Sequence, residues 1–429
     1  MISKKIDDNG FKILSLLILL NIFTGRFFEN ITFINIPLNF IILFFLFIKS
    51  KLHNEIFTYK DPILKIYFFY LLISLIQLLI GFNKHGIWAL RDGLYFLNMF
   101  FFFIAYFYSI NSHSIDKFDK FLSTTAFIGF IYVILVILDF KNFGPTIISQ
   151  QGNNFPLINF FNLRNIFIWI AFYLLIQENK SLLSNKFFPI VLIGLSIISF
   201  QSRTSYLTIF ILAIYFVSLN KISIKGIFKS IFLLIFIFLI VNLFNLNPSA
   251  NLSGRLTSEF SIDYLIDHIS TLFVFSDSYQ FGGTLAGPES SALARYGWWA
   301  EVIKKNSESL MGILFGQGFG IPLIDFKSST SGFAREPHNM FISVYGRQGL
   351  IGLLLFCMII FKSIIRIHRY INSKNISLKD RSVFLSYFVY ILVFTIGFIG
   401  DSILNYSCAS LGYFIFMGYI MGYQSKDSH

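Results

Sequence analysis

The sequence predicts an all-α integral membrane protein with about twelve transmembrane helices and one large extracytoplasmic loop. Three observations predict this fold class: composition, apolar stretches and charge distribution. Of the 429 residues, 55% are hydrophobic, 57 are Phe and only 13% are charged, and the mean hydropathy is +0.69. A soluble chain of this length could not bury so much apolar surface. Apolar stretches near the length that crosses a hydrocarbon layer of about 30 Å recur along nearly the whole chain.

The predicted spans follow from these apolar stretches. The first span has Lys4 and Lys5 ahead of it, no small-residue cleavage pattern behind it and a second apolar run directly after it. These features predict a retained anchor and no removable signal peptide. The spans are 11–24, 32–48, 62–81, 94–110, 121–139, 162–177, 187–201, 204–219, 227–244, 339–362, 383–400 and 406–423.

The charge distribution predicts the topology of these spans. The net charge of +12 could suggest a nucleic-acid partner, but Lys and Arg gather in alternate connecting segments. This asymmetry follows the positive-inside rule, so both termini are expected in the cytoplasm and no nucleic-acid partner is expected. The segments predicted to lie inside carry, for example, Lys49, Lys51, Lys60, Lys221, Lys225, Lys229, Arg366, Arg369, Lys374, Lys379 and Arg381.

The predicted organisation has three parts: helices one to nine in residues 1–244, a large loop at 245–338, and helices ten to twelve in 339–429. A long loop among short ones is the expected place for function. Within it, "ARYGWWAEVIKK" predicts an amphipathic helix, "LFGQGFGIP" a Gly-rich turn and "SDSYQFGGTLAGPESS" a flexible connector. Cys357 and Cys408 fall in or at predicted spans, so neither a disulfide framework nor a zinc site is predicted.

Arginines on the outer side are candidates for binding an anion. Arg203 lies in a tight turn between two apolar runs, where an arginine is costly to desolvate. Its planar guanidinium could pair with two phosphate oxygens at once. The alternative is an interfacial side chain that extends toward water. Arg295 begins the amphipathic loop helix, for which a solvated helix face is an equal alternative. Arg255 and Arg91 are weaker candidates for substrate binding.

The segment "EPHNMFISVYGRQGLIGLLLF" offers a candidate base. Most lone histidines at a loop-to-helix junction serve in capping or packing. Here, however, Pro337 is well placed to start a helix. The positive end of the helix dipole would then disfavour the protonated, imidazolium form of His338. Neutral imidazole can accept a proton. Gly346, Gly349 and Gly352 form a small-residue face that lets a neighbouring helix approach closely, and Arg347 requires an anion, a carbonyl or a cavity.

These residues resemble the O-antigen polymerase and ligase superfamily of membrane glycosyltransferases from about residue 60 to the C-terminus. The run from His338 and Asn339 through nine residues to Gly349 and Gly352 is similar to that family's His-Asn-x9-Gly-x-x-Gly pattern. "QSRTSY" resembles its Ser-Arg turn, and "ARYGWWAEVIKKNSESLMGILFGQGFG" resembles its Arg-then-Trp helix leading to a Gly-x-Gly turn.

The resemblance implies a fold related to the lipid-donor (GT-C) type and a site on the periplasmic side of the bacterial inner membrane. It implies that His338, Arg203 and Arg295 are catalytic, and we expect Asn339, Arg255 and Arg91 to bind substrate. The substrate would be a glycan on undecaprenyl diphosphate, transferred in lipopolysaccharide biosynthesis with inversion and without metal or cofactor. A chain-length regulator and a flippase of the same pathway are the further partners expected.

Several alternatives remain open at this point. A polymerase and a ligase share this chemistry; Met340, where several ligases carry Glu, favours a polymerase. A transporter of lipid-linked sugars is disfavoured because the prominent cations cluster at the outer edge and no paired Gly- or Pro-broken spans are found. A metal site from Asp263, Asp267 and His268 is disfavoured because His268 lies about 100° around a helix from the aspartates, which favours a solvated surface helix.

Overall fold

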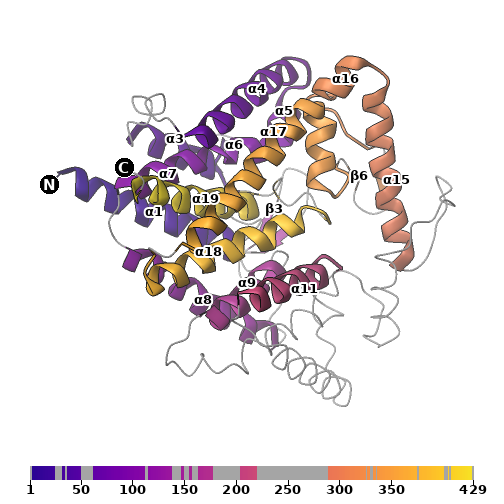
Figure 1. The fold of residues 1–429 in the computed structure, drawn as a ribbon. Coiled ribbons are helices and arrows are strands. Elements are labelled where there is room, and N and C mark those ends of the chain that lie inside the picture. The colour runs from indigo at the N-terminus through magenta and orange to yellow at the C-terminus, as the bar shows by residue number, and fades with distance from the viewer. Residues whose placement is uncertain are drawn as a thin grey trace, which may run out of the picture.

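The computed structural model is helical apart from three short antiparallel hairpins, within the residues that it describes (Figure 1). For some of these residues, Arg203 among them, only the backbone is described. The predicted spans 187–201 and 227–244 lie outside the described residues, as does the part of the loop from 245 to 287. The described residues are 2–24, 31–33, 36–49, 61–111, 115–137, 146–148, 154–156, 163–176, 203–219, 288–324, 326–328, 332–334, 336–373, 376–400, 404 and 407–427.

Helices occupy the predicted spans that fall on described residues. They are α1 (Ile2–Thr24), α3 (Leu38–Lys49), α4 (Pro62–His85), α7 (Phe100–Asn111), α8 (Ile115–Ile137), α9 (Leu163–Ile176), α11 (Arg203–Ser218), α17 (Met340–Ile371), α18 (Leu378–Gly397) and α19 (Ser407–Asp427). Two short helices, α5 (Ile87–Asp92) and α6 (Leu94–Asn98), connect α4 to α7, and α15 (Pro288–Ser307) and α16 (Leu310–Phe315) belong to the predicted loop. The hairpins pair β1 (Thr32–Phe33) with β2 (Ile36–Pro37), β3 (Thr146–Ile148) with β4 (Asn154–Pro156), and β5 (Phe326–Ser328) with β6 (Gly332–Ala334).

The prediction for residues 32–48 was wrong at its start. Residues 32 to 37 contain the β1–β2 hairpin, and the helix begins only at Leu38. Pro37 explains the difference, because a proline pushes the residue before it into extended backbone and has no N–H to donate within a helix. The Leu38 N–H donates to the Ile31 carbonyl (3.0 Å), which closes the hairpin against the first turn of α3.

Three helices, α4, α17 and α18, are long and apolar enough to cross a membrane, among the residues described. Shorter apolar helices accompany them, at Lys12–Thr24, Leu38–Ile48, Phe96–Ile110, Asn165–Ile176 and Thr204–Ser218. Most of the apolar stretch of α18 is buried, whereas less than half of the apolar stretch is buried in α4 and in α17. These features are those of a membrane protein; the total of twelve spans stays a prediction.

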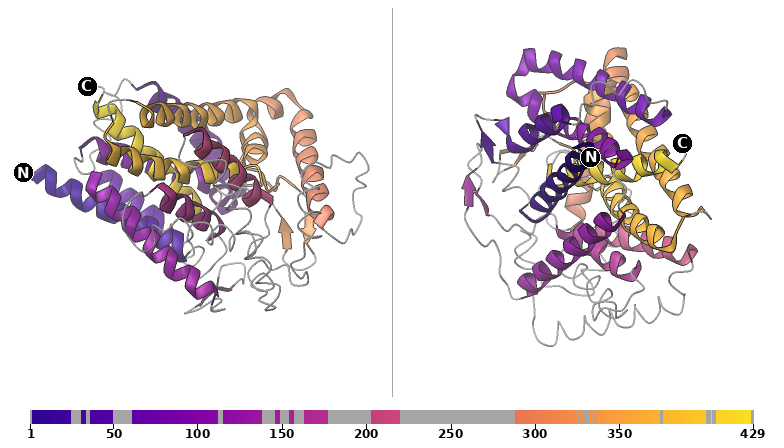
Figure 2. Two further views of the ribbon diagram at one scale, coloured as in Figure 1. Left: turned by 60° about the horizontal axis from the view of Figure 1, so that its bottom comes forward. Right: turned by 90° about the vertical axis from the view of Figure 1, so that its left-hand side faces the viewer.

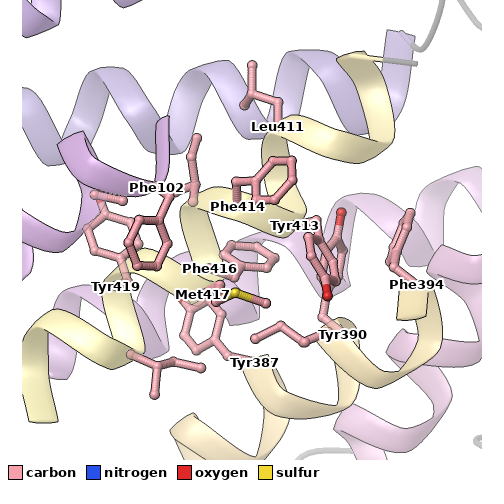
Figure 3. Close-up of a cluster of buried hydrophobic side chains, with 14 of the residues drawn as sticks. Phe102, Tyr387, Tyr390, Phe394, Leu411, Tyr413, Phe414, Phe416, Met417 and Tyr419 are labelled. Atoms are coloured by element: carbon pink, nitrogen blue, oxygen red, sulfur yellow. The ribbon is translucent and has the colours of Figure 1, made fainter. Parts of the chain in front are cut away.

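The core centres on α7, α18 and α19. Helices α7 and α19 lie side by side along their length, and glycines on α19 allow this: a Cβ on Gly418 would lie 2.3 Å from the Phe102 carbonyl oxygen, and one on Gly422 would lie 2.2 Å from that of Tyr106. Aromatic rings fill the space beside them (Figure 3). Tyr390 stacks on Phe394 with ring centroids 4.4 Å apart. This packing holds α18, whose end helps to form the site, in a fixed position.

Ion pairs join helix ends on the side of the bundle away from the site. Arg366, near the end of α17, pairs with Asp61, which caps the start of α4, and Lys379 of α18 pairs with Asp116 of α8. Helices α4 and α17 are therefore antiparallel, as the predicted alternation of loops requires. Which of the two sides faces the cytoplasm stays a prediction.

Candidate functional site

The start of α17, the end of α18, the start of α11 and the loop helix α15 meet at one end of the bundle. The end of α18 is the centre of this junction. The Phe398 carbonyl accepts a hydrogen bond from the Met340 N–H (2.8 Å), and the Ile399 carbonyl accepts one from the Asn339 side chain (3.1 Å). The junction gathers several of the residues that the sequence singled out.

His338 lies in the turn that leads into α17, held by α15. Its backbone is left-handed, with φ at 50°, and it is the only non-glycine residue with positive φ among those described. The imidazole lies against Trp298 of α15, with ring centroids 5.6 Å apart. The neighbouring Trp299 donates from its indole N–H to the Pro337 carbonyl (2.8 Å). A left-handed non-glycine residue costs about 1–3 kcal/mol, so these contacts must offset the strain.

Asn339, and not Pro337, starts the helix, so that part of the prediction was wrong. The Asn339 side chain accepts from the Ile342 N–H (3.1 Å), which makes Asn339 the N-cap and Met340 the first helical residue. The left-handed backbone of His338 separates Pro337 from the helix. The fixed φ of the proline therefore constrains the loop before the helix and not the first turn of α17. Asn339 thus has a structural role, and its substrate-binding role stays a prediction.

Arg203 is the first residue of α11, and the backbone brings it to the same junction. Gly400, directly after the end of α18, lies so close to the start of α11 that a Cβ there would be 1.9 Å from Cγ2 of Thr204. Gly400 follows Ile399, which the Asn339 side chain contacts. The short path from Asn339 through Ile399 and Gly400 to Thr204 therefore joins the starts of α17 and α11. The Arg203 side chain itself lies outside the described residues.

Arg295 shares a face of α15 with the tryptophan that contacts His338. It precedes Trp298 by three residues, so both side chains lie on the same side of the helix, with Arg295 partly buried. The predicted loop helix is confirmed by α15, which covers all of "ARYGWWAEVIKK". Of the two other predicted cations, Arg91 has its guanidinium over the Trp88 ring (5.2 Å), and Arg255 lies outside the described residues. The metal-site candidates Asp263, Asp267 and His268 also lie outside the described residues.

Arg347 is a buried cation that the sequence analysis could not assign to a partner. Its side chain is 1% exposed and its Nη2 pairs with two carboxylates, Asp92 of α5 at 3.0 Å and Glu336 at 2.7 Å. Its Nη1 donates to the carbonyls of Gly318 (3.3 Å) and Ile321. Since Glu336 is two residues before His338, this ion-pair group fixes one side of the histidine turn to α5. The sequence signal was the arginine inside an apolar helix, but its partners are distant in sequence.

A glycine turn at residues 316–320 packs on a kink in α17. Gly349 has φ at 64° and interrupts the helix, which deprives nearby carbonyls of their usual helical donors. The N–H groups of Gln317 and Gly318 replace those donors, bonding to the carbonyls of Gly346 (2.8 Å) and Arg347 (2.9 Å). The predicted Gly-rich turn is confirmed, with positive φ at Gly316, Gly318 and Gly320.

The predicted small-residue face of α17 was only partly right. Gly346 does face another helix, since a Cβ there would lie 2.8 Å from Val302 of α15. A Cβ on Gly349 would also meet a neighbouring helix, at 2.4 Å from the Leu314 carbonyl carbon of α16, whereas one on Gly352 would meet the Gln348 side chain of its own helix. Equal spacing in sequence cannot reveal this difference, nor that Gly349 also has a positive φ, a conformation that favours glycine.

Alanine at Gly349 is expected to destabilise the protein more than alanine at Gly318. Both glycines have positive φ, which costs alanine about 1 kcal/mol, but a Cβ on Gly318 meets nothing within 4 Å. Gly349→Ala adds the backbone clash at Leu314, so we expect a total loss of about 2–4 kcal/mol. Thermal unfolding of the two purified variants in the same detergent measures the difference. Equal unfolding midpoints would contradict the close packing of α16 on the kink.

The described residues thus define a helical membrane protein with a polar junction at one end of its bundle. Residues 188–357 match a family model described as O-antigen ligase, and this range includes Arg203, Arg295 and the whole run from His338 to Gly352. No curated protein matches the chain. This match supports the resemblance to the O-antigen polymerase and ligase superfamily that the motifs predicted, and with it an enzyme of the glycosyltransferase type.

Proposed function

We propose that this protein is an O-antigen polymerase, which transfers glycan from an undecaprenyl-diphosphate donor onto a lipid-linked repeat unit at the periplasmic face of the inner membrane. The observation that carries the proposal is the junction itself, where His338 lies against α15 and the start of α11 lies beside Gly400. A histidine and two arginine positions thus converge on one helix junction. The proposal includes a twelve-span fold of the GT-C type, with both termini in the cytoplasm.

The proposed chemistry is a direct displacement at the anomeric carbon. The acceptor hydroxyl oxygen attacks that carbon while its proton passes to the His338 imidazole, and the bond from the sugar to the lipid diphosphate breaks with its electron pair going to the diphosphate. Arg203 and Arg295 stabilise the negative charge that develops there, so no metal ion or cofactor is required. A single displacement inverts the anomeric centre. Arg91 and Arg255 would bind the substrate's anionic groups outside this centre.

The acceptor distinguishes the proposed polymerase from a ligase. Met340 favours the polymerase by its identity, yet its side chain is fully buried in the core, so any influence on the acceptor acts through packing and not by contact. The description of the matching family model as O-antigen ligase favours the second candidate, transfer of finished polymer to lipid A-core. Both candidates use the same donor and the same site residues.

Deleting the gene and separating the lipopolysaccharide on a gel distinguishes the two candidates. We expect core that carries a single repeat unit, because ligation continues without polymerisation. Bare core with accumulated lipid-linked polymer would instead identify a ligase. Unchanged lipopolysaccharide would contradict both, and extension of lipid-linked repeat units by the purified protein would exclude a pure transporter.

The same deletion strain tests the arginine proposed to stabilise the leaving diphosphate. Loss of one such donor lowers rates by about 10²–10³, so Arg203→Ala should restore almost no long chains. Lys379→Ala is the matched control, because Lys379 is an exposed cation at the opposite end of the bundle and its loss should leave the chain-length pattern unchanged. A normal pattern from Arg203→Ala, at equal membrane abundance, would overturn the assignment of Arg203.

A further inference from the structure

The short loop helix α16 carries an exposed apolar ridge, which we define as Leu310, Met311 and Phe315. The sequence of this helix, LMGILF, has no polar side chain, and none of its residues is buried. Leu310 is 70% exposed and Met311 is 65% exposed. Soluble surfaces rarely present a wholly apolar element of this kind, so the ridge requires an explanation.

The contacts of α16 place it beside two membrane-spanning helices. The Gln77 side chain of α4 donates to the Phe315 carbonyl (2.8 Å), and Gly349 at the kink of α17 lies against the backbone of Leu314 and Phe315. Figure 1 shows α16 at the same end of the bundle as the end of α4. Gly81 of α4 also packs on the turn after α16, where a Cβ would lie 2.5 Å from the Phe319 carbonyl oxygen.

These contacts set the depth of α16 relative to the apolar part of α4. Gln77 comes four residues before residue 81, the end of the predicted span, which is about 6 Å along the helix axis. The neighbours of Gln77 on α4 are themselves exposed apolar side chains, Ile76 and Ile80, and Leu350 is exposed directly after the α17 kink. The backbone of α16 therefore lies beside exposed apolar surfaces of α4 and α17.

The sequence before α16 changes from charged to apolar at the same place. Lys304 is exposed near the end of α15, and Ser309 caps α16 by accepting from the Gly312 N–H (2.9 Å). The segment between them, residues 306–309, is polar and includes the exposed Glu308, so a charged and polar stretch gives way to a wholly apolar helix at Leu310. Such a change of polarity is expected where a chain enters the boundary between headgroups and acyl chains.

We propose that α16 is embedded in the bilayer, with Leu310, Met311 and Phe315 in contact with lipid acyl chains. The loop that carries Trp298 and Trp299 is thereby anchored in one leaflet of the bilayer. This inference goes beyond the proposed function, because it concerns the surface that the bilayer covers and requires no particular acceptor or reaction.

Fluorescence quenching of full-length protein in lipid nanodiscs tests the proposal. Met311→Cys and Lys304→Cys would each be labelled with bimane, in a background with Cys357→Ala and Cys408→Ala that still restores the deletion strain. Ile76→Cys provides the reference for a lipid-facing position on α4. Brominated phospholipids quench from within the bilayer, whereas iodide quenches from water.

We expect the ratio of lipid quenching to iodide quenching at Met311 to be close to that at Ile76 and well above that at Lys304, because a side chain among acyl chains is shielded from iodide in water. Iodide quenching at Met311 equal to that at Lys304 would overturn the proposal. Both readouts are independent of glycan transfer, so a failure here is distinguishable from a failure of the proposed function in the deletion strain.

Discussion

His338→Gly is expected to abolish glycan transfer while raising the stability of the protein. His338 is held at φ 50°, a conformation that costs a non-glycine residue about 1–3 kcal/mol and costs glycine little. Removal of a general base lowers rates by about 10²–10⁴, enough to remove the long chains from the lipopolysaccharide pattern. Chain length in the deletion strain and the unfolding midpoint of the purified protein measure the two effects.

Two companion variants separate the loss of the ring from the relief of strain. His338→Ala loses the same ring but keeps the left-handed backbone, so it should be as inactive as His338→Gly and less stable. His338→Asn should be inactive with intermediate stability, because asparagine tolerates the left-handed region better than alanine. Long chains from any of the three variants would contradict the general-base role, and a glycine variant less stable than the alanine variant would contradict the backbone conformation.

Arg347→Met is expected to cause the largest loss of stability. It would leave the Asp92 carboxylate, 3% exposed, and the Glu336 carboxylate without the cation that lies between them. Removing one partner from a buried ion-pair group costs about 3–5 kcal/mol, because the remaining charges stay buried. Thermal unfolding of the purified protein in detergent measures the loss. Arg347→Lys should be intermediate, since an ammonium group cannot reproduce the planar set of guanidinium donors.

Two controls test the prediction for Arg347: a variant of the ion pair at the opposite end of α17, and a triple variant in which Arg347 and both of its carboxylate partners are replaced by uncharged residues. Arg366 is 28% exposed and its partner Asp61 is 9% exposed, so Arg366→Met should cost less than Arg347→Met, whose ion-pair group is more deeply buried. Combining Arg347→Met with Asp92→Asn and Glu336→Gln removes all three charges and should recover much of the stability. An Arg347→Met protein that unfolds at the same temperature as the Arg366→Met protein would contradict the buried group.

The helices were predictable because their signal is local. The predicted span 62–81 begins at Pro62, where α4 begins, although the helix continues to His85, beyond the predicted end. The amphipathic pattern likewise indicated α15, so composition and periodicity were sufficient to predict that these helices exist. The hairpin before Leu38 was missed because its residues are as apolar as the helix after it. In such a run only the proline indicates the boundary.

The sequence predicted candidate site residues but not the geometry of the junction where they lie. His338, Arg295 and Arg203 were found through motifs, yet their meeting depends on Gly400 and Ile399 at the end of α18, which carry no motif. The partners of Arg347 were invisible for the same reason, since Asp92 is distant in sequence and its role depends on tertiary contacts. Single sequences report local pattern and leave such long-range pairs unspecified.

The kink at Gly349 divides α17 into a short segment that follows His338 and a long apolar segment. The segment before the kink is bonded to the glycine turn and to the end of α18, whereas the segment after it is part of a helix long and apolar enough to cross a membrane. Spans tilt to match the thickness of their bilayer, and an uninterrupted helix would carry that tilt to His338. We therefore expect the interruption at Gly349 to reduce how far a tilt of the long segment moves the histidine when the bilayer thickness changes.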